Sequence, residues 1–432
     1  YKLGNNTMAG TLFYTVLLNT FVIYLIYRLA LNFMTPKYAL FTAIFYAVAP
    51  WPVYYSFGFW NPIPMAFFGS LLFLSLWQVT KVDNSSSIFW VCLIAAIIPQ
   101  FHMISLFYYP AILLILYLSP TRINTTWLSL GIIAGIAVYL PYILGEINNN
   151  WENTRAVLSG GSPSSFGVFK IITAPLGVLS SQSGRWTGDD ITNLYRYGDL
   201  YFGSFIIMLI FFVVSIVNSV FFMRKIFWDY VCALGKFYLP TKQAYKNSPE
   251  IMFIGIILFV PPLLFLLTRH NYGSRYVIII FPLIFLLPAM YMQALKYGKK
   301  KKFFISNIAI ICTFNVYLLF SFFHYQAGQI DSGNYFIPSF INMDIVYNKL
   351  KSDAGKDGHI SIDAALYKSK HPATDEYYAG SALTRYISLK QKAEMHSSEV
   401  KQTQVYRIVD INDVQKSDKL VYTSNNMALI RL

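Results

Sequence analysis

The chain has 432 residues, of which 56% are hydrophobic and only 12% are charged, and its mean hydropathy is positive. This composition excludes an ordinary water-soluble enzyme, because a soluble domain of this length could not expose so much apolar surface. The net charge of +14 lies largely in the breaks between apolar stretches. That pattern indicates membrane orientation and no nucleic-acid partner.

Ten apolar stretches, most of them near the length of about 20 residues that a helix needs to cross the hydrocarbon, follow one another along the chain. Their hydrophobicity is continuous and not alternating, which predicts an α-helical polytopic membrane protein instead of a barrel. The fourth and fifth are short, and Gln100 and His102 separate them, so we expect a pair of crossings there. The stretches are 10–27, 38–57, 62–80, 86–101, 103–119, 126–145, 200–223, 251–268, 275–295 and 303–323.

Basic residues gather on one side of these expected crossings. That side holds fourteen Lys and Arg residues and three acidic ones, whereas the other side holds seven and five before residue 325. Basic residues resist translocation, so the first side is predicted to be cytoplasmic and the second to face outward. The cytoplasmic set comprises Arg28, Lys37, Lys81, Arg122, Arg224–Glu250 and Lys296–Lys302.

The composition changes after Phe323 to that of a soluble domain of roughly a hundred residues. We therefore expect a transmembrane domain over residues 1–324 and a small α/β domain over residues 325–432, outside the membrane. Alternating patterns predict strands and amphipathic patterns predict helices in this tail. The strands are expected at 359–363, 405–409 and 419–423, and the helices at 342–353 and 374–391.

Polar and aromatic residues gather at the outward ends of the crossings and suit a lipid-phosphate substrate. Such a substrate needs an apolar groove, cations at headgroup depth and polar groups for a sugar, and the planar fork of arginine donates two hydrogen bonds to phosphate. Each residue also has a plainer interpretation, as an interfacial anchor, a headgroup contact or a packed histidine. The candidates are Tyr54, Tyr55, Trp60, Asn61, Gln100, His102, Arg269, His270, Asn271, Arg275 and Tyr276.

Two neighbouring carboxylates, Asp189 and Asp190, lie in the longest outer loop, which runs from Glu146 to about Asp199. They could hold a divalent cation, although the sequence favours the plainer interpretation of a solvated loop. The three cysteines lie far apart without metal-ligand spacing. Neither a zinc site nor a disulfide framework is predicted.

Four motifs follow one another on the outward side of the membrane region. They are Tyr54-Tyr-Ser-Phe-Gly-Phe-Trp-Asn-Pro62, Gln100-Phe-His102, Leu140-Pro-Tyr-Ile-Leu-Gly-Glu146 with Asn153-Thr-Arg155, and Ser274-Arg-Tyr276. In this order they resemble bacterial family 39-like glycosyltransferases, relatives of the protein O-mannosyltransferases and of the lipid A aminoarabinose transferase. The resemblance extends from about residue 10 to residue 324. Each motif is weak alone, and the specificity comes from their order and shared face.

The resemblance implies a C-type glycosyltransferase fold and inverting transfer from a polyprenyl-phosphate sugar to a lipid, glycan or protein acceptor. In such enzymes a carboxylate in the first outer loop is the general base, and a divalent metal could assist the leaving phosphate. That loop would precede Tyr1, so we expect a missing N-terminal segment to carry the base. The individual roles are hypotheses of our own and are not carried over from the family: Arg155, Arg269 or Arg275 near the phosphate, and Asn61, Gln100 or His102 near the sugar. Tyr55 and Tyr276 complete the predicted substrate-binding set.

Two other functions remain open. A secondary transporter also places polar groups inside a helical bundle, but it places them near the midplane and commonly has an inverted repeat, which this sequence lacks. A non-catalytic membrane assembly protein is the second alternative. The favoured interpretation places the chain in a bacterial inner membrane with its C-terminal domain outside.

Overall fold

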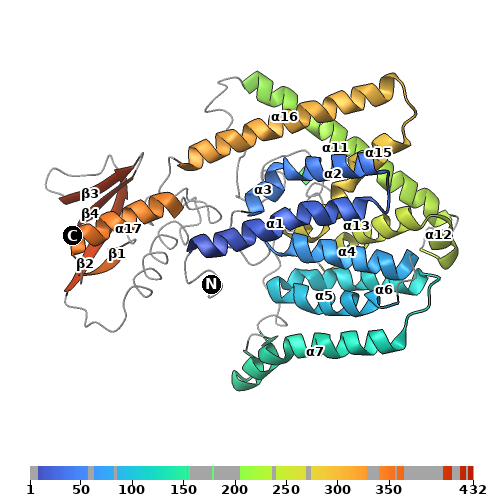
Figure 1. The fold of residues 1–432 in the computed structure, drawn as a ribbon, viewed down its shortest axis with the longest axis horizontal. Coiled ribbons are helices and arrows are strands. Elements are labelled where there is room, and N and C mark those ends of the chain that lie inside the picture. The colour runs from blue at the N-terminus through green and yellow to red at the C-terminus, as the bar shows by residue number, and fades with distance from the viewer. Residues whose placement is uncertain are drawn as a thin grey trace. The chain divides into compact units, whose positions relative to one another are not determined.

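The computed structural model describes residues 8–56, 63–81, 85–152, 154–155, 178–179, 205–235, 240–268, 274–327, 340–355, 358–363, 402–410, 419–424 and 427–431 (Figure 1). The chain divides into two compact units. The first, here called the helical unit, comprises Leu18–Val53 and Asn61–Val316. The second, the mixed unit, comprises Tyr1–Leu17, Tyr54–Trp60 and Tyr317–Leu432.

Each of the ten apolar stretches coincides with one or more helices. Among the described residues, three helical stretches are long and apolar enough to cross a bilayer, namely Phe13–Ala30, Thr125–Asn148 and Val277–Ala294. The chain is therefore an α-helical membrane protein, whereas the number of crossings stays a prediction. The helices of this region are α1 (Met8–Ala30), α2 (Pro36–Ala47), α3 (Pro50–Ser56), α4 (Met65–Lys81), α5 (Ser87–Phe101), η2 (Met103–Tyr108), α6 (Tyr109–Leu118), α7 (Thr125–Asn148), α11 (Phe205–Leu234), α12 (Lys242–Asn247), α13 (Pro249–Thr268), η4 (Ser274–Ile280), α14 (Phe281–Ile284), α15 (Leu286–Ala294) and α16 (Lys299–Ala327).

Proline divides two of the predicted crossings into shorter helices. The 38–57 stretch forms α2 and then α3, which begins at Pro50, because a residue before proline disfavours helical backbone. The 275–295 stretch begins as the 3-10 helix η4 and continues as α14 and α15. Pro282 and Pro288 each remove a backbone donor there. Neither stretch is the single helix that its length predicts.

Helix α11 continues past its predicted end at residue 223 to Leu234. The helix continues through this charged segment because Lys225 and Asp229, four residues apart, form an ion pair along it. Gly235 then adopts a φ of 70°, a left-handed conformation that commonly ends helices.

Several turns of the helical unit meet at one end, which we call the basic end. Phe33, in the turn after α1, packs on Trp77 near the end of α4, with ring centroids 4.6 Å apart, and on Phe253 near the start of α13, at 6.1 Å. The backbone N–H of Thr35 donates to Gln293 Oε1 of α15 at 2.8 Å. The turns that hold the predicted cytoplasmic residues are thus brought together.

Hydrogen bonds at the end of α4 fix the direction of its neighbours. Ser87, at the start of α5, donates to Gln78 Oε1 at 2.9 Å, and Ser119, after α6, donates to the Thr80 carbonyl oxygen at 3.2 Å. Tyr245 of α12 donates to Thr80 Oγ1 at 3.2 Å. Because the start of α5 and the end of α6 both lie beside the end of α4, α5 and α6 run in opposite directions. The fourth and fifth stretches are thus two separate antiparallel helices, and their crossing of the membrane as a pair stays a prediction.

The other end of the helical unit, here called the distal end, is held together by aromatic pairs. Phe68 of α4 stacks on Phe101 of α5 with centroids 5.2 Å apart. Phe107 of η2 stacks on Phe265 of α13 at 4.1 Å. The start of α4, the end of α5, η2 and the end of α13 therefore lie together, and η4 contacts both α4 and η2.

Gly69 allows α4 to approach η4 closely at this end. A Cβ on Gly69 would lie 2.4 Å from the backbone carbonyl oxygen of Ile279, which cannot move aside as a flexible side chain would. We predict that Gly69→Ala lowers the free energy of unfolding of the purified protein in detergent by about 1–3 kcal/mol. Gly145→Ala is the control, because its Cβ would meet nothing within 4 Å. Equal stability of the two variants would contradict this close packing.

The mixed unit contains a four-stranded sheet of order β1-β2-β4-β3, in which β1 and β2 are parallel and the other pairs antiparallel. The strands and the 342–353 helix agree with the sequence prediction, whereas β4 was not predicted and the 374–391 helix lies outside the described residues. The elements are α17 (Phe340–Ala354), β1 (Gly358–Asp363), β2 (Gln402–Asp410), β3 (Lys419–Ser424) and β4 (Met427–Arg431).

A small polar network joins α17 to this sheet. The buried Tyr406 donates its hydroxyl hydrogen to Asp353 Oδ2 at 3.0 Å, and Arg431 Nη1 lies 3.3 Å from the same oxygen. Burial and the Asp353 carboxylate raise the pKa of Tyr406. The phenol therefore stays protonated and remains a donor at neutral pH.

Candidate functional site

Gln100 and His102 lie at the distal end, where α5 passes into η2. Gln100 is exposed, whereas His102 is partly buried. His102 Nδ1 accepts the backbone N–H of Ile104 at 3.2 Å and so caps η2. Its carbonyl oxygen accepts the Ser105 hydroxyl at 3.0 Å. His102 therefore has a structural role in fixing the turn, whatever it does toward a substrate.

The chain after α7 is fastened to that helix by a buried carboxylate. Glu146 is 1% exposed, and its Oε2 accepts the Thr154 N–H at 2.8 Å and the Thr154 hydroxyl at 2.6 Å. The Tyr142 hydroxyl lies 3.2 Å from Thr154 Oγ1. The intervening turn passes through Asn150 and Trp151 at φ 53° and 61°, a left-handed conformation that asparagine tolerates but tryptophan rarely adopts. We call Tyr142, Glu146 and Thr154 the α7 latch.

The α7 latch holds Arg155 at the distal end. Helix α7 starts beside the start of α5, where the Trp127 and Phe89 rings are 6.3 Å apart, so its last turn lies at the other end of α5. Arg155 follows Thr154 directly, is exposed, and donates its backbone N–H to the Trp151 carbonyl at 2.9 Å. Its guanidinium is thus presented from a fixed backbone.

Replacing Thr154 tests the latch. Thr154→Val preserves the shape of the side chain but removes the hydroxyl that donates to the buried Glu146 carboxylate. We predict a loss of about 1.5–3 kcal/mol in the free energy of unfolding, the range for a hydrogen bond to a charged group. Thr154→Ser retains the donor and should retain most of the stability. Thermal unfolding in detergent measures both, and coincident transitions of the two variants would contradict a stabilising latch.

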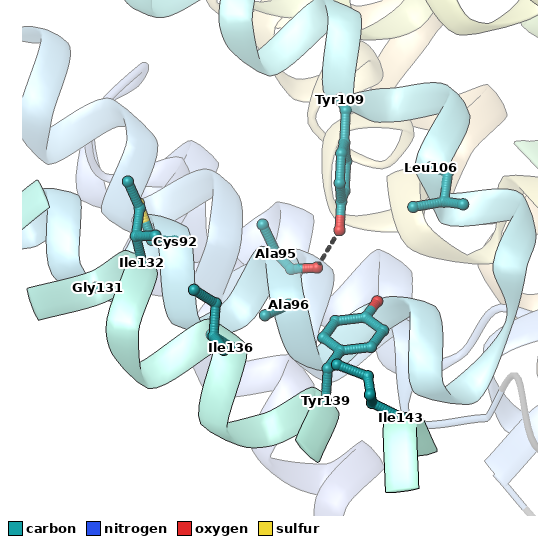
Figure 2. Close-up of a pocket in the computed structure, with 11 residues that line it drawn as sticks. Cys92, Ala95, Ala96, Leu106, Tyr109, Gly131, Ile132, Ile136, Tyr139 and Ile143 are labelled. Atoms are coloured by element: carbon teal, nitrogen blue, oxygen red, sulfur yellow. Dashed lines mark hydrogen bonds between the residues drawn. The ribbon is translucent and has the colours of Figure 1, made fainter. Parts of the chain in front are cut away.

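A groove of about 470 Å³ opens between α5, η2, α6 and α7 (Figure 2). Gly131 and Gly135 bring α7 close to α5 beneath it, since a Cβ on Gly131 would lie 2.8 Å from the Cβ of Cys92. Its wall is largely apolar. The apolar lining includes Ala96, Leu106, Ile132, Ile136 and Ile143.

Two tyrosines supply the hydroxyl groups of this groove. Pro99 has no N–H, so the carbonyl of Ala95, four residues earlier, loses its usual helical partner. The Tyr109 hydroxyl replaces that partner and donates to the Ala95 oxygen at 2.6 Å. The Tyr139 ring points its hydroxyl toward that of Tyr109 (Figure 2). The two tyrosines thus connect α6 and α7 to α5 at the point where Pro99 interrupts the backbone hydrogen bonds of α5.

Of the remaining predicted residues, four lie in described helices and seven lie outside the described part of the chain. Arg275 and Tyr276 lie in the first turn of η4, whose backbone contacts α4 and η2 at the distal end. Tyr54 and Tyr55 lie in α3, and nothing further is described for their side chains. Outside the described residues lie Trp60, Asn61, Asp189, Asp190, Arg269, His270 and Asn271.

The sequence patterns did not single out Glu146, which ends the Leu140–Glu146 motif, or Tyr109, which lies within the 103–119 stretch. Two signals could have found them: an acid at the end of an apolar run needs a partner, and Pro99 leaves a carbonyl that needs a donor. Among the described residues, no group of three or more His, Cys, Asp or Glu gathers that could hold a metal ion.

Comparisons with protein-family models, with curated protein sequences and with solved structures find no match for this chain.

Proposed function

We propose that this chain belongs to a membrane glycosyltransferase that transfers a sugar, with inversion, from a polyprenyl-phosphate donor to an acceptor on the outer face of the membrane. The observation that carries the proposal is the groove between α5 and α7. It leads to the distal end, because Leu106 belongs to η2, which His102 caps, and Ile143 lies three residues before Glu146. A long apolar chain with a polar head would find both environments there.

The distal end also supplies cations of the type that phosphate needs. Arg155 is exposed beside the α7 latch, and Arg275 lies in the first turn of η4. A guanidinium can bind two phosphate oxygens at once. These two arginines are set apart from the basic residues that collect at the other end of the bundle, where orientation accounts for their presence.

In the proposed reaction the acceptor hydroxyl oxygen forms a bond to the anomeric carbon as the bond from that carbon to the phosphate oxygen breaks. The hydroxyl proton passes to a general base, for which the family resemblance implies an outer-loop carboxylate, and the electron pair leaves with the polyprenyl phosphate. Arg155 and Arg275 stabilise the growing negative charge, a role that a divalent cation could share. Gln100 and His102 contact the sugar.

The groove offers a matched pair of variants for the test. Ile136 lines the groove, whereas Ile133 lies on α7 with 63% of its surface exposed and is not part of the lining. Ile136→Trp should fill the groove and raise the KM for a synthetic polyprenyl-phosphate sugar about fivefold to thirtyfold. This corresponds to about 1–2 kcal/mol of lost apolar contact. Ile133→Trp should change the KM less than twofold.

The same preparation separates the competing functions. Absence of transfer from polyprenyl-phosphate sugars, combined with uptake of a solute into vesicles that contain the protein, would favour a secondary transporter. Absence of both activities would favour a non-catalytic assembly protein. Equal KM values for the two tryptophan variants, with transfer intact, would mean that the donor chain binds elsewhere.

A further inference from the structure

Six lysines from two separate turns converge at the basic end. Lys37 lies in the first turn of α2, directly after the turn between α1 and α2. Lys296 lies in the turn between α15 and α16, and the other four lysines form the first turn of α16. The two turns touch, because the Thr35 N–H donates to Gln293 Oε1 at 2.8 Å and Lys301 Nζ lies 5.1 Å from the centre of the Tyr38 ring. We call the set Lys37, Lys296, Lys299, Lys300, Lys301 and Lys302 the six-lysine cluster.

The charges of the cluster are not balanced within the described protein. Residues 28–38 and 293–302 contain no acidic residue. Among the described residues the acidic side chains near this end are Asp229, which pairs with Lys225, and Glu250. No ion pair joins a described acid to any of the six lysines. Five of the six are exposed, and the sixth, Lys301, is partly buried and donates to the Leu295 carbonyl oxygen at 3.2 Å.

The position of the lysines on α16 adds to their repulsion. Four consecutive lysines form the first turn of this helix, where the backbone dipole favours anions and disfavours cations. Lys299 and Lys302 are also three residues apart, a spacing at which like charges on one helix face repel. An anion bound here would relieve both effects and would meet the free N–H groups of the helix start.

The residues around the lysines indicate that such an anion would be the headgroup of a bilayer lipid. The lysines lie where apolar helices end, and α16 turns apolar directly after Lys302. Tyr38 and Tyr297 lie among them, and Lys302 Nζ is 5.7 Å from the centre of the Tyr297 ring. Tyrosines and lysines in this arrangement are typical of headgroup depth, where lysine stems cover apolar surface and their ammonium groups reach the phosphates.

We propose that the six-lysine cluster is a binding site for the phosphate headgroup of an anionic phospholipid. The site is independent of the sugar transfer proposed above and lies at the opposite end of the helical unit. Charge and location both select a lipid with a net negative head over a zwitterionic one, since the attraction to an anionic surface grows with each lysine.

The experiment titrates the full chain in detergent, at low ionic strength, with fluorescent phosphatidylglycerol and, separately, with fluorescent phosphatidylcholine. The native chain should bind the anionic lipid more tightly. Lys299→Gln with Lys300→Gln should weaken its binding about tenfold to thirtyfold. The control, Lys349→Gln with Lys351→Gln, removes the same charge from α17 and should leave affinity unchanged. High salt should abolish the difference, because it screens exposed charges.

Three results would overturn the proposal. They are equal affinity of the native chain for the two lipids, an equal loss in both double variants, and displacement of the lipid by soluble glycerol phosphate at a similar concentration. The last result would indicate a site for free phosphate. Thermal unfolding in phosphatidylcholine, expected to be the same for both double variants, shows that a lost affinity is not lost folding.

Discussion

A cysteine introduced at Lys300 of a cysteine-free chain is expected to resist a membrane-impermeant thiol reagent added to intact cells, whereas one introduced at Lys390 is expected to be labelled. The reason is the charge of the basic end. The predicted cytoplasmic set holds fourteen Lys and Arg residues and three acidic ones, and each Lys or Arg opposes translocation of its turn. The effect is close to all-or-none because a turn lies on one side of the membrane or the other.

Permeabilised cells provide the control. Lys300 is exposed at the start of α16, so a cysteine there should react once the membrane is opened. Labelling at Lys300 in intact cells, with protection at Lys390, would reverse the orientation and place the distal end inside. The proposed outward transfer would then fail with it. Labelling at both positions would agree with an outward tail but would contradict the cytoplasmic position of the basic end.

The side-by-side arrangement of the basic turns could be predicted because one physical rule acts on all of them. Lys81, Arg122 and the 240–248 segment fall between apolar runs of crossing length, and alternating crossings must return each to the same side. The structure adds what fastens them. Ser119 and Tyr245 both bond to Thr80, but a serine and a tyrosine in turns far apart in sequence carry no signal of a shared partner.

The distal end was less predictable, because its form depends on backbone details. Proline-broken helix at 275–295 alters where Arg275 and Tyr276 sit, since a 3-10 helix rises faster and turns more tightly than an α-helix. The α7 latch depends on a chain reversal that places Trp151 in a left-handed conformation, which is unfavourable for a bulky side chain.

In the mixed unit, the short strand β4 lies between β2 and β3 in the sheet. A pattern of five residues cannot specify which strands it pairs with.

Arg275→Ala is expected to reduce transfer from a polyprenyl-phosphate sugar about tenfold to a hundredfold. If the guanidinium holds the donor phosphate, its loss removes a charge-assisted hydrogen bond of about 1.5–3 kcal/mol. Arg275 lies in the first turn of η4, which packs on α4 and η2 at the distal end. The reduction should appear in both kcat/KM and kcat if the bond strengthens as the phosphate leaves, and chiefly in KM if it only binds the donor.

Arg122→Ala is the matched control, because it removes the same side chain from the turn between α6 and α7. Arg122 is exposed at the basic end, where its charge serves orientation and lies the length of the bundle from the proposed donor phosphate. Its loss should change transfer less than twofold. Purified variants are compared at equal protein concentration, and thermal unfolding of each distinguishes lost phosphate binding from lost structure. Equal activity of the two variants would make Arg275 a boundary anchor and would leave Arg155 to bind the phosphate. Equal activity of an Arg155→Ala variant as well would mean that neither arginine binds the donor phosphate, and the proposal of a lipid-phosphate donor would lose its support at the distal end.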